Sequence, residues 1–504
     1  MPSPKSLHTV AIIGGGATML SFLVQFINKI KKHKIRQIKE ILIFNNSTHF
    51  GCGLAYEPKT PPSCRLNMRT STMSLWAEHD DEFKQYLTKK NIKFKTNQEL
   101  EFPPRNIFGE FLRHKMTDVI KDAQDHLAIE IKTLPESVNF VNRVSKSMWQ
   151  IKSENNKSYL AEYLVFALGN LPSQNYSNLL LNKNYIHEPY KEICTQKLAD
   201  KKSITVLGTS LTAIDCALLL TETYKYKGKI YLVSRHGLLP KVQAEIPQTT
   251  ELNYLEDLIN KAKKSKRLTL DDFKLALSYD IGIPLASDWK EYLPKLPAEQ
   301  ELEKDIFLAE RNLTAQWQST LSKASLKMPY IWQALETESK KAFLRDFYSL
   351  WCIYRHGMPL INAKKILSLI KSKRLKILPN LLSVNTNKNS FTISFKSDKK
   401  WPQNKEKIQT DIVINATGTG HYISRSNNKL MLQLLNNGIL QEHELGGVVV
   451  DTQSCQIIDK QNKKVKSAYF IGPLLRGAFF NTNALEMNAL QAELAVNSII
   501  KKLI

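Results

Sequence analysis

A strand, a glycine turn and a helix follow one another at the start of the chain and again near its middle, and this repetition limits the possible folds. Residues 8–13 form an apolar run of β character, glycines occupy 14–16, and residues 17–30 are mostly apolar over the length of a helix. A second apolar run at 40–44 returns as a strand. The pattern predicts a βαβ unit whose glycines lie at the first turn.

The first glycine turn suits a bound phosphate. Glycine permits a tight bend and lets a pyrophosphate approach the backbone N–H groups at the helix N-terminus. In the G-x-G-x-x-G pattern, Met19 takes the third glycine position, and Asn45 or Asn46 stands where an acid usually binds the ribose. Taken alone, the segment also fits a glycine turn in an ordinary α/β fold. The candidate cofactor-binding residues here are Gly14, Gly15, Gly16 and Asn45.

The second unit has the same order. A strand is predicted over 203–207, a turn over 208–213, a helix over 214–223 and a second strand over 229–233. The turn fits G-x-G-x-x-G/A with serine in second place and alanine in third. Its candidate cofactor-binding residues are Gly208, Ser210, Leu211 and Thr212.

Ser234 and Arg235 follow the second strand of this unit, where a site that prefers NAD carries an acid. An arginine there can pair with the 2′-phosphate of NADP. We therefore expect NADPH as the nicotinamide cofactor, with NADH left open. The alternative interpretation of Arg235 is a surface arginine at a strand end.

The rest of the chain divides into a helical part and a return to β structure. Strand signals largely vanish between 252 and 360, which predicts a helical insertion. Alternation returns over 375–395, and 412–416 predicts a buried strand shortly before Gly418. A strand and a long helix are predicted within 468–504.

Length and composition set broader limits. A chain of 504 residues exceeds the size at which one core keeps growing, so two or more domains are expected. The six cysteines form no CxxC pair, which predicts reduced thiols, no metal site and a cytoplasmic location. No secretory leader and no membrane span are expected. The net charge of +24 lies in lysine-rich stretches without a nucleic-acid-binding motif, so we expect a basic surface and no specific nucleic-acid partner.

Short motifs along almost the whole chain resemble one superfamily. They are Gly51-Cys52-Gly53-Leu54-Ala55-Tyr56, Leu66-Asn67-Met68, Met73-Ser74, Pro104-Arg105, 208–215, 234–240, Phe343-Leu344-Arg345, Arg355-His356 and 472–477. In this order they resemble the FAD/NAD(P)-binding flavoproteins with two dinucleotide-binding domains, a superfamily that includes flavin-containing monooxygenases and amine N-hydroxylases. The resemblance is strongest to a bacterial group within it.

The resemblance implies an α/β fold with two Rossmann-like dinucleotide-binding domains. The FAD-binding domain would be discontinuous, with a first part at 1–172 and a second part at 416–504. The NAD(P)H-binding domain would span 173–415 and carry the helical insertion at 252–360.

The same resemblance places further residues around FAD and NADPH. The loop with Gly53 and Leu54 would lie near the FAD pyrophosphate, and Asn67 with Met68 near the isoalloxazine. Gly472 would lie close to a helix N-terminus at the flavin edge, where positive potential stabilises reduced flavin. Gly418 follows a strand end and completes the cofactor-binding set.

No acid–base constellation stands out, and Arg476, near the predicted flavin edge, is the candidate to touch substrate or flavin. The first hypothesis is an NADPH-dependent flavin oxidoreductase, a monooxygenase on an unknown small molecule. The second is a non-catalytic or regulatory dinucleotide-binding protein that engages a partner through its basic surface. A reductase without oxygen chemistry is a third. We expect the insertion to border a substrate pocket between the two domains.

Overall fold

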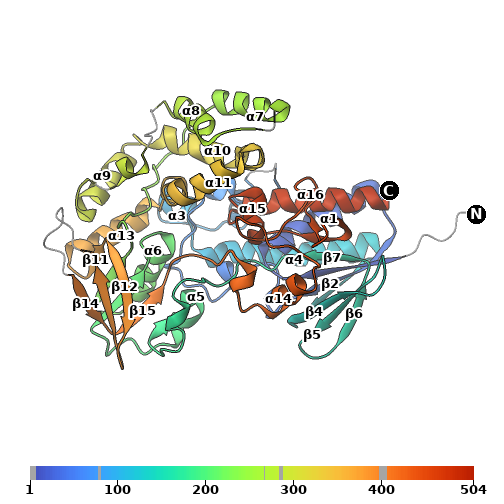
Figure 1. The fold of residues 1–504 in the computed structure, drawn as a ribbon, viewed down its shortest axis with the longest axis horizontal. Coiled ribbons are helices and arrows are strands. Elements are labelled where there is room, and N and C mark those ends of the chain that lie inside the picture. The colour runs from blue at the N-terminus through green and yellow to red at the C-terminus, as the bar shows by residue number, and fades with distance from the viewer. Residues whose placement is uncertain (1–6, 78–80, 266, 283–287, 294, 397–405) are drawn as a thin grey trace, which may run out of the picture.

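The two glycine turns lie in two separate α/β lobes. The computed structural model describes residues 7–77, 81–265, 267–282, 288–293, 295–396 and 406–504. Figure 1 shows one lobe at the right, the other at the left, and a layer of helices along the top.

The right-hand lobe is built on a six-stranded sheet with the order β16-β17-β7-β1-β2-β3. Its strands are parallel except for β16, which pairs antiparallel with β17. Because β17 comes from the C-terminal part of the chain and pairs with β7, the predicted discontinuous domain is confirmed. The strands are β1 His8–Ile13, β2 Ile38–Phe44, β3 Glu130–Leu134, β7 Tyr163–Phe166, β16 Gln456–Ile458 and β17 Lys464–Phe470.

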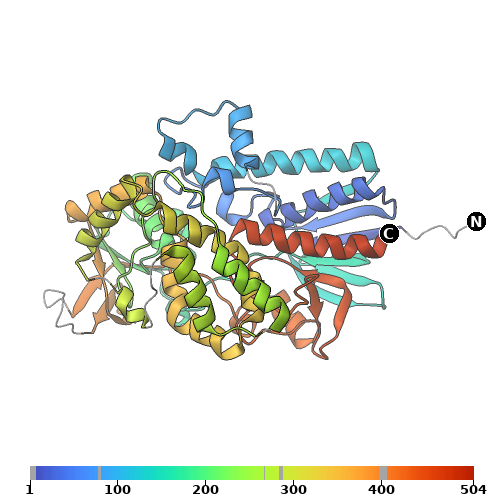
Figure 2. The ribbon, with the colours of Figure 1, turned by 90° about the horizontal axis from the view of Figure 1, so that it is seen from above.

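Three long helices cover this sheet: α1 (Ala17–His33), α4 (Arg105–Leu127) and α16 (Leu485–Leu503). α1 packs against both α4 and α16, and Figure 2 shows α16 lying beside α1. The C-terminal helix therefore completes a layer that the N-terminal βαβ unit begins.

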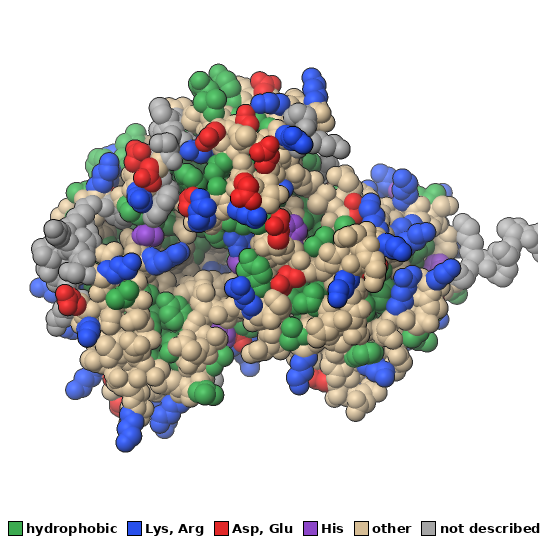
Figure 3. Space-filling view, viewed as in Figure 1, with side chains coloured by type: hydrophobic (Ala, Val, Ile, Leu, Met, Phe, Trp, Pro, Cys, Tyr) green, Lys and Arg blue, Asp and Glu red, His purple; other side chains and the backbone are tan. Residues whose placement is uncertain are grey.

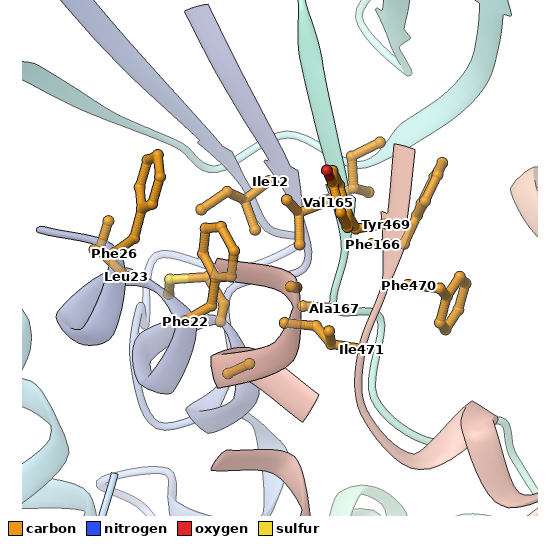
Figure 4. Close-up of a cluster of buried hydrophobic side chains, with 14 of the residues drawn as sticks. Ile12, Phe22, Leu23, Phe26, Val165, Phe166, Ala167, Tyr469, Phe470 and Ile471 are labelled. Atoms are coloured by element: carbon orange, nitrogen blue, oxygen red, sulfur yellow. The ribbon is translucent and has the colours of Figure 1, made fainter. Parts of the chain in front are cut away.

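The core of this lobe joins residues from both ends of the chain (Figure 4). Phe22 and Phe26 on α1 face the sheet, where Ile12 and Val165 lie next to Tyr469. All five side chains are fully buried. At about 1.5–3 kcal/mol for each large apolar side chain removed from water, this shared core ties the two parts of the domain together.

The left-hand lobe has a second sheet with the order β11-β10-β9-β15-β8, and all of its pairings are parallel. α6 and α13 pack on one face, whereas β12 and β13 contribute to a hydrophobic cluster on the other. The chain thus has the α/β fold with two Rossmann-type sheets that its sequence predicted. The elements are β8 Tyr185–Ile186, β9 Ser203–Leu207, α6 Leu211–Leu218, β10 Lys229–Val233, α13 Leu360–Lys371, β11 Leu375–Leu378 and β15 Ile412–Asn415.

Two three-stranded antiparallel sheets and several short helices complete the lobes. The small sheets are β4 Val138–Arg143, β5 Trp149–Ser153 and β6 Ser158–Ala161, and β12 Leu381–Thr386, β13 Phe391–Phe395 and β14 Lys407–Thr410. The short helices are α2 Glu82–Lys89, α3 Asn97–Glu101, α5 Pro189–Glu192, α14 Lys429–Asn436 and α15 Arg476–Phe479.

The predicted insertion is helical, and it is divided into short helices. α9 ends at Glu310 and α10 begins at Ala315, because Asn312 takes a left-handed conformation with φ +56°. A π-helical turn at Phe343–Phe347 likewise separates α11 from α12. The helices are α7 Asn253–Ser265, α8 Leu270–Ile281, α9 Ala298–Glu310, α10 Ala315–Ala334, α11 Thr337–Ala342 and α12 Tyr348–Arg355. None of the helices in the described ranges is long and apolar enough to cross a membrane.

The insertion packs onto the first lobe through aromatic side chains. Trp332 is fully buried, and its Nε1 donates a hydrogen bond to the carbonyl of Gly477 at 2.8 Å. Trp332 and Trp351 both pack against Phe480. These two tryptophans therefore belong to a core shared with the C-terminal segment.

The chain crosses between the lobes twice, and the two crossings lie side by side. The N–H of Gly420 donates to the carbonyl of Leu171 at 3.0 Å. The hydroxyls of Ser173 and Thr417 are hydrogen-bonded at 3.0 Å. The outgoing and returning segments thus form one narrow two-stranded connection.

A buried ion pair also joins the lobes. Arg105, the first residue of α4, places Nη2 2.5 Å from Oδ2 of Asp215 on α6. Tyr190 donates to the same carboxylate oxygen at 2.7 Å, and Nε of Arg105 donates to the carbonyl of Arg65 at 3.0 Å. Burial is the largest influence on Arg105 and opposes its charge, but Asp215, together with Tyr190 and Cys64, raises the pKa of the guanidinium well above its ordinary value.

We expect Asp215→Asn to lower the free energy of unfolding by about 3–5 kcal/mol, because it leaves the Arg105 guanidinium buried without a counter-charge. Asp122→Asn is the matched control. It breaks the half-exposed Lys31–Asp122 pair and should cost no more than about 1 kcal/mol. Denaturant titration of both variants measures the difference, and equal losses would contradict the role given to the buried pair.

Candidate functional site

The first glycine turn touches the end of a neighbouring strand. Gly14 has φ +110°, and a Cβ there would overlap the carbonyl oxygen of Ala167, which follows β7. A Cβ on Gly15 would lie 2.7 Å from Cβ of Asn45, the residue after β2. Close packing of the sheet therefore requires glycine at both positions.

Gly16 and Gly53 pack closely against each other. A Cβ on Gly16 would lie 3.5 Å from Cα of Gly53, and one on Gly53 would lie 3.2 Å from Cα of Gly16. Gly16 is the N-cap of α1, no side chain caps this helix, and its first turn has no acidic residue. The backbone N–H groups at this helix end thus lie beside two closely packed glycines, an arrangement that suits phosphate. Leu54 begins the short helix after Gly53 and is 43% exposed.

The two residues that depart from the glycine pattern have structural roles. Nδ2 of Asn45 donates to the carbonyls of Ser47 and His49, at 3.2 and 3.1 Å, and so orders its own loop. Its Oδ1 is left as an acceptor, without the charge that a carboxylate would bring. Met19 is fully buried in the core of the lobe.

The second glycine turn repeats the geometry of the first. Gly208 has φ +125°, and a Cβ there would lie 2.5 Å from the carbonyl oxygen of Ala416, which follows β15. Ser210 is the N-cap of α6 but makes no side-chain cap bond, and the first turn, with Leu211 and Thr212, contains no acid. Gly418 has φ +90°, and no described atom lies within 4 Å of its Cβ position.

Ser234 and Arg235 lie at the end of β10, beside this second turn. The Oγ of Ser234 accepts from the N–H of Gly237 at 2.9 Å and is hydrogen-bonded to Oγ1 of Thr209 at 3.1 Å. Ser234 thus holds the loop after β10 against the glycine turn. The Arg235 side chain is exposed and forms no ion pair with any acid in the described ranges, so its charge is available to a ligand.

Buried polar atoms without partners collect near the start of α16. Gly472 has φ +108°, and its N–H donates to Oε1 of Gln491 at 2.6 Å. Nε2 of Gln491 and Oδ1 of Asn488 have no hydrogen-bond partner among the described residues. Because an unpaired buried polar group costs about 1–3 kcal/mol, these atoms indicate a ligand or ordered water here.

Arg355 and Glu486 form a buried ion pair at the same helix end. Nη2 of Arg355 lies 3.1 Å from Oε1 of Glu486, and the Arg355 side chain is only 6% exposed. Nε of Arg355 and Oε2 of Glu486 lack partners in the described part of the chain. Burial, and then the charge of Arg355, lowers the pKa of His356 to about 3. His356 is therefore neutral at physiological pH and is unsuited to donate a proton.

A pocket of about 220 Å³ opens between the lobes and the insertion. Its walls come from 67–72 in the first lobe, the segment 243–248, α10 and the end of α12. Gln243 ties these parts together by donating to the carbonyls of Asn67 and Gly357, at 2.6 and 2.8 Å. Asn67, Met68, Tyr354 and Arg355 all line this pocket.

Arg476 does not line this pocket. Its guanidinium lies over the ring of Tyr348, 4.2 Å from the centroid, and its buried Nε has no partner among the described residues. Burial, and then the charge of Arg476, lowers the pKa of His421 to about 3. Of the arginines in the resembling motifs, Arg355 lies at the pocket and Arg105 at the lobe interface.

A second, larger pocket of about 1030 Å³ lies on the other lobe, between β10, β11 and α9. Figure 3 shows the surface hollowed between the helices at the upper left and the strands at the lower left. Lys241 and Asp305 form an ion pair at 3.1 Å in its lining. None of the candidate residues Gly208, Ser210, Ser234 and Arg235 lines it.

Sequence reasoning missed the residues that build the walls of the 220 Å³ pocket. Arg69 donates to the carbonyl of Ala244 at 2.5 Å and pairs with Glu101 at 3.1 Å. Gln318 donates to the carbonyl of Val242 and accepts from the N–H of Ala244. These contacts join segments far apart in the chain, and neither periodicity nor a local motif signals them.

Comparisons with known proteins agree with this geometry. A family model described as FAD-NAD(P)-binding matches residues 11–171, and no curated protein matches the sequence. Among solved structures, an L-lysine 6-monooxygenase from Pseudomonas syringae is similar with a TM-score of 0.59 at 11% identity, covering 99% of this chain and 100% of the other. The reduced form of an ornithine hydroxylase from Pseudomonas aeruginosa gives 0.58 at 12% identity, covering 99% and 100%. A cadaverine monooxygenase from Erwinia amylovora, bound to FAD, gives 0.54 at 13% identity, covering 98% and 94%.

The agreement covers nearly the full length of these structures, so it includes both lobes and the insertion. At such low identity it establishes the fold, whereas the family model independently covers the first βαβ unit. Residues 11–171 therefore match an FAD-NAD(P)-binding family model, and the chain as a whole has the two-lobed fold of these solved structures.

Proposed function

We propose that this protein is an FAD-dependent, NADPH-using monooxygenase that acts on a small molecule. One observation carries the proposal: two glycine turns of the same geometry lie at uncapped helix N-termini in two parallel sheets. One such turn fits many α/β proteins, whereas two of them, joined by an interlobe pocket, suit a flavin and a nicotinamide cofactor that exchange a hydride.

The residues of the first lobe fit FAD. The N-terminus of α1, beside Gly16 and Gly53, would take the pyrophosphate, because a larger side chain at either glycine would hinder the approach of the ligand to the backbone N–H groups. Asn45 would offer one acceptor to the ribose in place of a carboxylate. The unpartnered atoms of Asn488 and Gln491 would find their partners on a polar ring edge near Gly472.

In the second lobe, the turn with Gly208, Ser210, Leu211 and Thr212 would hold the NADPH pyrophosphate, next to Gly418. Arg235 would pair with the 2′-phosphate. We place the domain boundaries near 172 and 415, where the two crossings leave the first lobe and return to it. The six cysteines are all free thiols, which supports a cytoplasmic location.

When bound, FAD supplies hydride acceptance and oxygen activation, so this chain needs few catalytic side chains of its own. Its residues orient the substrate and exclude water. The Arg355–Glu486 pair holds the Arg355 guanidinium beside the pocket, and Glu486 balances its charge. Neutral His356 adds no competing acid. Arg476, stacked on Tyr348, would fix the helix that carries Arg355 and stays our candidate for contact with flavin or substrate.

The similar structures support oxygen chemistry on an amine, because they are described as an L-lysine 6-monooxygenase, an ornithine hydroxylase and a cadaverine monooxygenase. The second candidate is a regulatory dinucleotide-binding protein. The uncharged Asn45 and the buried Met19 favour it, since both depart from the usual FAD pattern.

One experiment separates these two candidates. The purified protein, reconstituted with FAD, should show flavin absorbance at roughly 370 and 450 nm, and NADPH should bleach it. Oxygen should then restore the oxidised spectrum. A protein that retains no flavin after reconstitution would favour the regulatory candidate.

We expect Gly16→Val to lower the flavin content of the purified protein strongly, because its methyl groups would press against Gly53 and hinder the approach of the pyrophosphate to the N-terminus of α1. Gly169→Val is the matched control, since no described atom lies within 4 Å of its Cβ position, although its φ of +73° makes that change destabilising too. Flavin per folded protein is the measurement. Unchanged flavin content in Gly16→Val would show that the pyrophosphate lies elsewhere.

Arg235→Ala should weaken NADPH binding by about 1–3 kcal/mol and leave NADH nearly unchanged, because only NADPH carries the 2′-phosphate. Arg345→Ala, at an exposed arginine paired with the adjacent Asp346, serves as the control. Flavin reduction rates at varied cofactor concentrations measure both effects. An equal loss with the two cofactors would remove the basis for preferring NADPH.

A further inference from the structure

The charged residues that line the 220 Å³ pocket are all cations. Arg69, Lys323 and Arg355 line it, and no aspartate or glutamate is among its lining residues in the described part of the chain. Such a lining favours a ligand that brings negative charge and disfavours a ligand whose groups are all positive.

Two of these three cations are neutralised from behind the pocket wall. Arg69 pairs with Glu101 at 3.1 Å, and Arg355 pairs with Glu486 at 3.1 Å. Both pairs have side chains that are less than 15% exposed, so neither acid is free to move toward a ligand. These pairs fix the pocket wall and add little net charge.

Lys323 differs from both arginines. Its Nζ donates to the carbonyl of Thr250, and no acid in the described ranges pairs with it. The next lysine on α10, Lys327, pairs with Glu256 at 2.6 Å and does not line the pocket. Lys323 is therefore the lining cation without a counter-charge.

The exposure of the lining residues distinguishes the mouth of the pocket from its buried end. Lys323 and Gln248 are exposed, whereas Ala244, Ala315 and Gly357 are buried. Lys323 thus stands at the mouth, and Arg355 lies at the buried end with Asn67. A ligand that fills the pocket would have one end at an uncompensated ammonium and the other near the predicted flavin position.

We propose that this pocket selects a substrate with a carboxylate, which Lys323 binds at the mouth while the reacting end lies toward Asn67 and Arg355. The assignment rests on the proposed function, because it uses the same pocket. A charge-assisted contact at Lys323 strengthens binding of the carboxylate by about tenfold, less than for a fully buried pair because the mouth is open to solvent. A diamine has no group that Lys323 can bind, and its end at the mouth meets the positive charge of Lys323.

Compounds that differ by one carboxylate test this proposal on the flavin-loaded protein. Lysine and cadaverine form one such pair, and aminohexanoate and pentylamine form another. Calorimetric titration should show that the carboxylate-bearing member of each pair binds about tenfold more tightly. Lys323→Gln should reduce this preference to within about twofold, whereas Lys327→Gln, which removes one charge from the next turn of the same helix, should retain it.

Three results would overturn the proposal: equal or tighter binding of the decarboxylated members, an unchanged preference in Lys323→Gln, or no binding of either carboxylate. The flavin spectrum of each preparation is recorded first. Failure to hold flavin would count against the proposed function, whereas a normal spectrum with the wrong ligand preference would count against the carboxylate site alone.

Discussion

The buried contact between Arg105 and Asp215 determines how the two lobes meet. Arg105 begins α4 in one lobe, Asp215 lies within α6 in the other, and neither charge could remain buried without the other. Tyr190 donates a hydrogen bond to the carboxylate of Asp215. Because this contact fixes the separation of the lobes, it also fixes the spacing between the two glycine turns and the width of the pocket between them. Hydride exchange between two cofactors depends on such spacing.

Much of the fold could be predicted from local sequence. The apolar runs at 8–13 and 203–207, each followed by glycine, specify their strands and turns directly, and the return of β pattern near 412 specifies β15. The breaks in the insertion could not be predicted in this way. The left-handed conformation of Asn312 and the π-helical turn at Phe343–Phe347 interrupt stretches whose apolar spacing is that of continuous helices.

The candidate site also has one part that the sequence predicts and another that it does not. The glycine positions follow from backbone geometry that only glycine adopts without strain, so sequence alone could name Gly14 and Gly208. The lining of the 220 Å³ pocket depends on which segments, distant in the sequence, meet in the fold. Nothing in the local pattern around Gln243 or Lys323 distinguishes them from surface residues, and their significance appears only when the insertion lies against 67–72.

The contacts of Ala167 and Ala416 have a mechanical consequence. Each alanine touches the first glycine of a dinucleotide turn, and each also begins one of the two paired crossings between the lobes. Any hinge motion must bend those crossings, because they are the covalent links between the lobes. Rotation of one lobe would therefore displace the carbonyl groups of Ala167 and Ala416, which contact Gly14 and Gly208. A movement of the lobes would in this way change the position of both glycine turns.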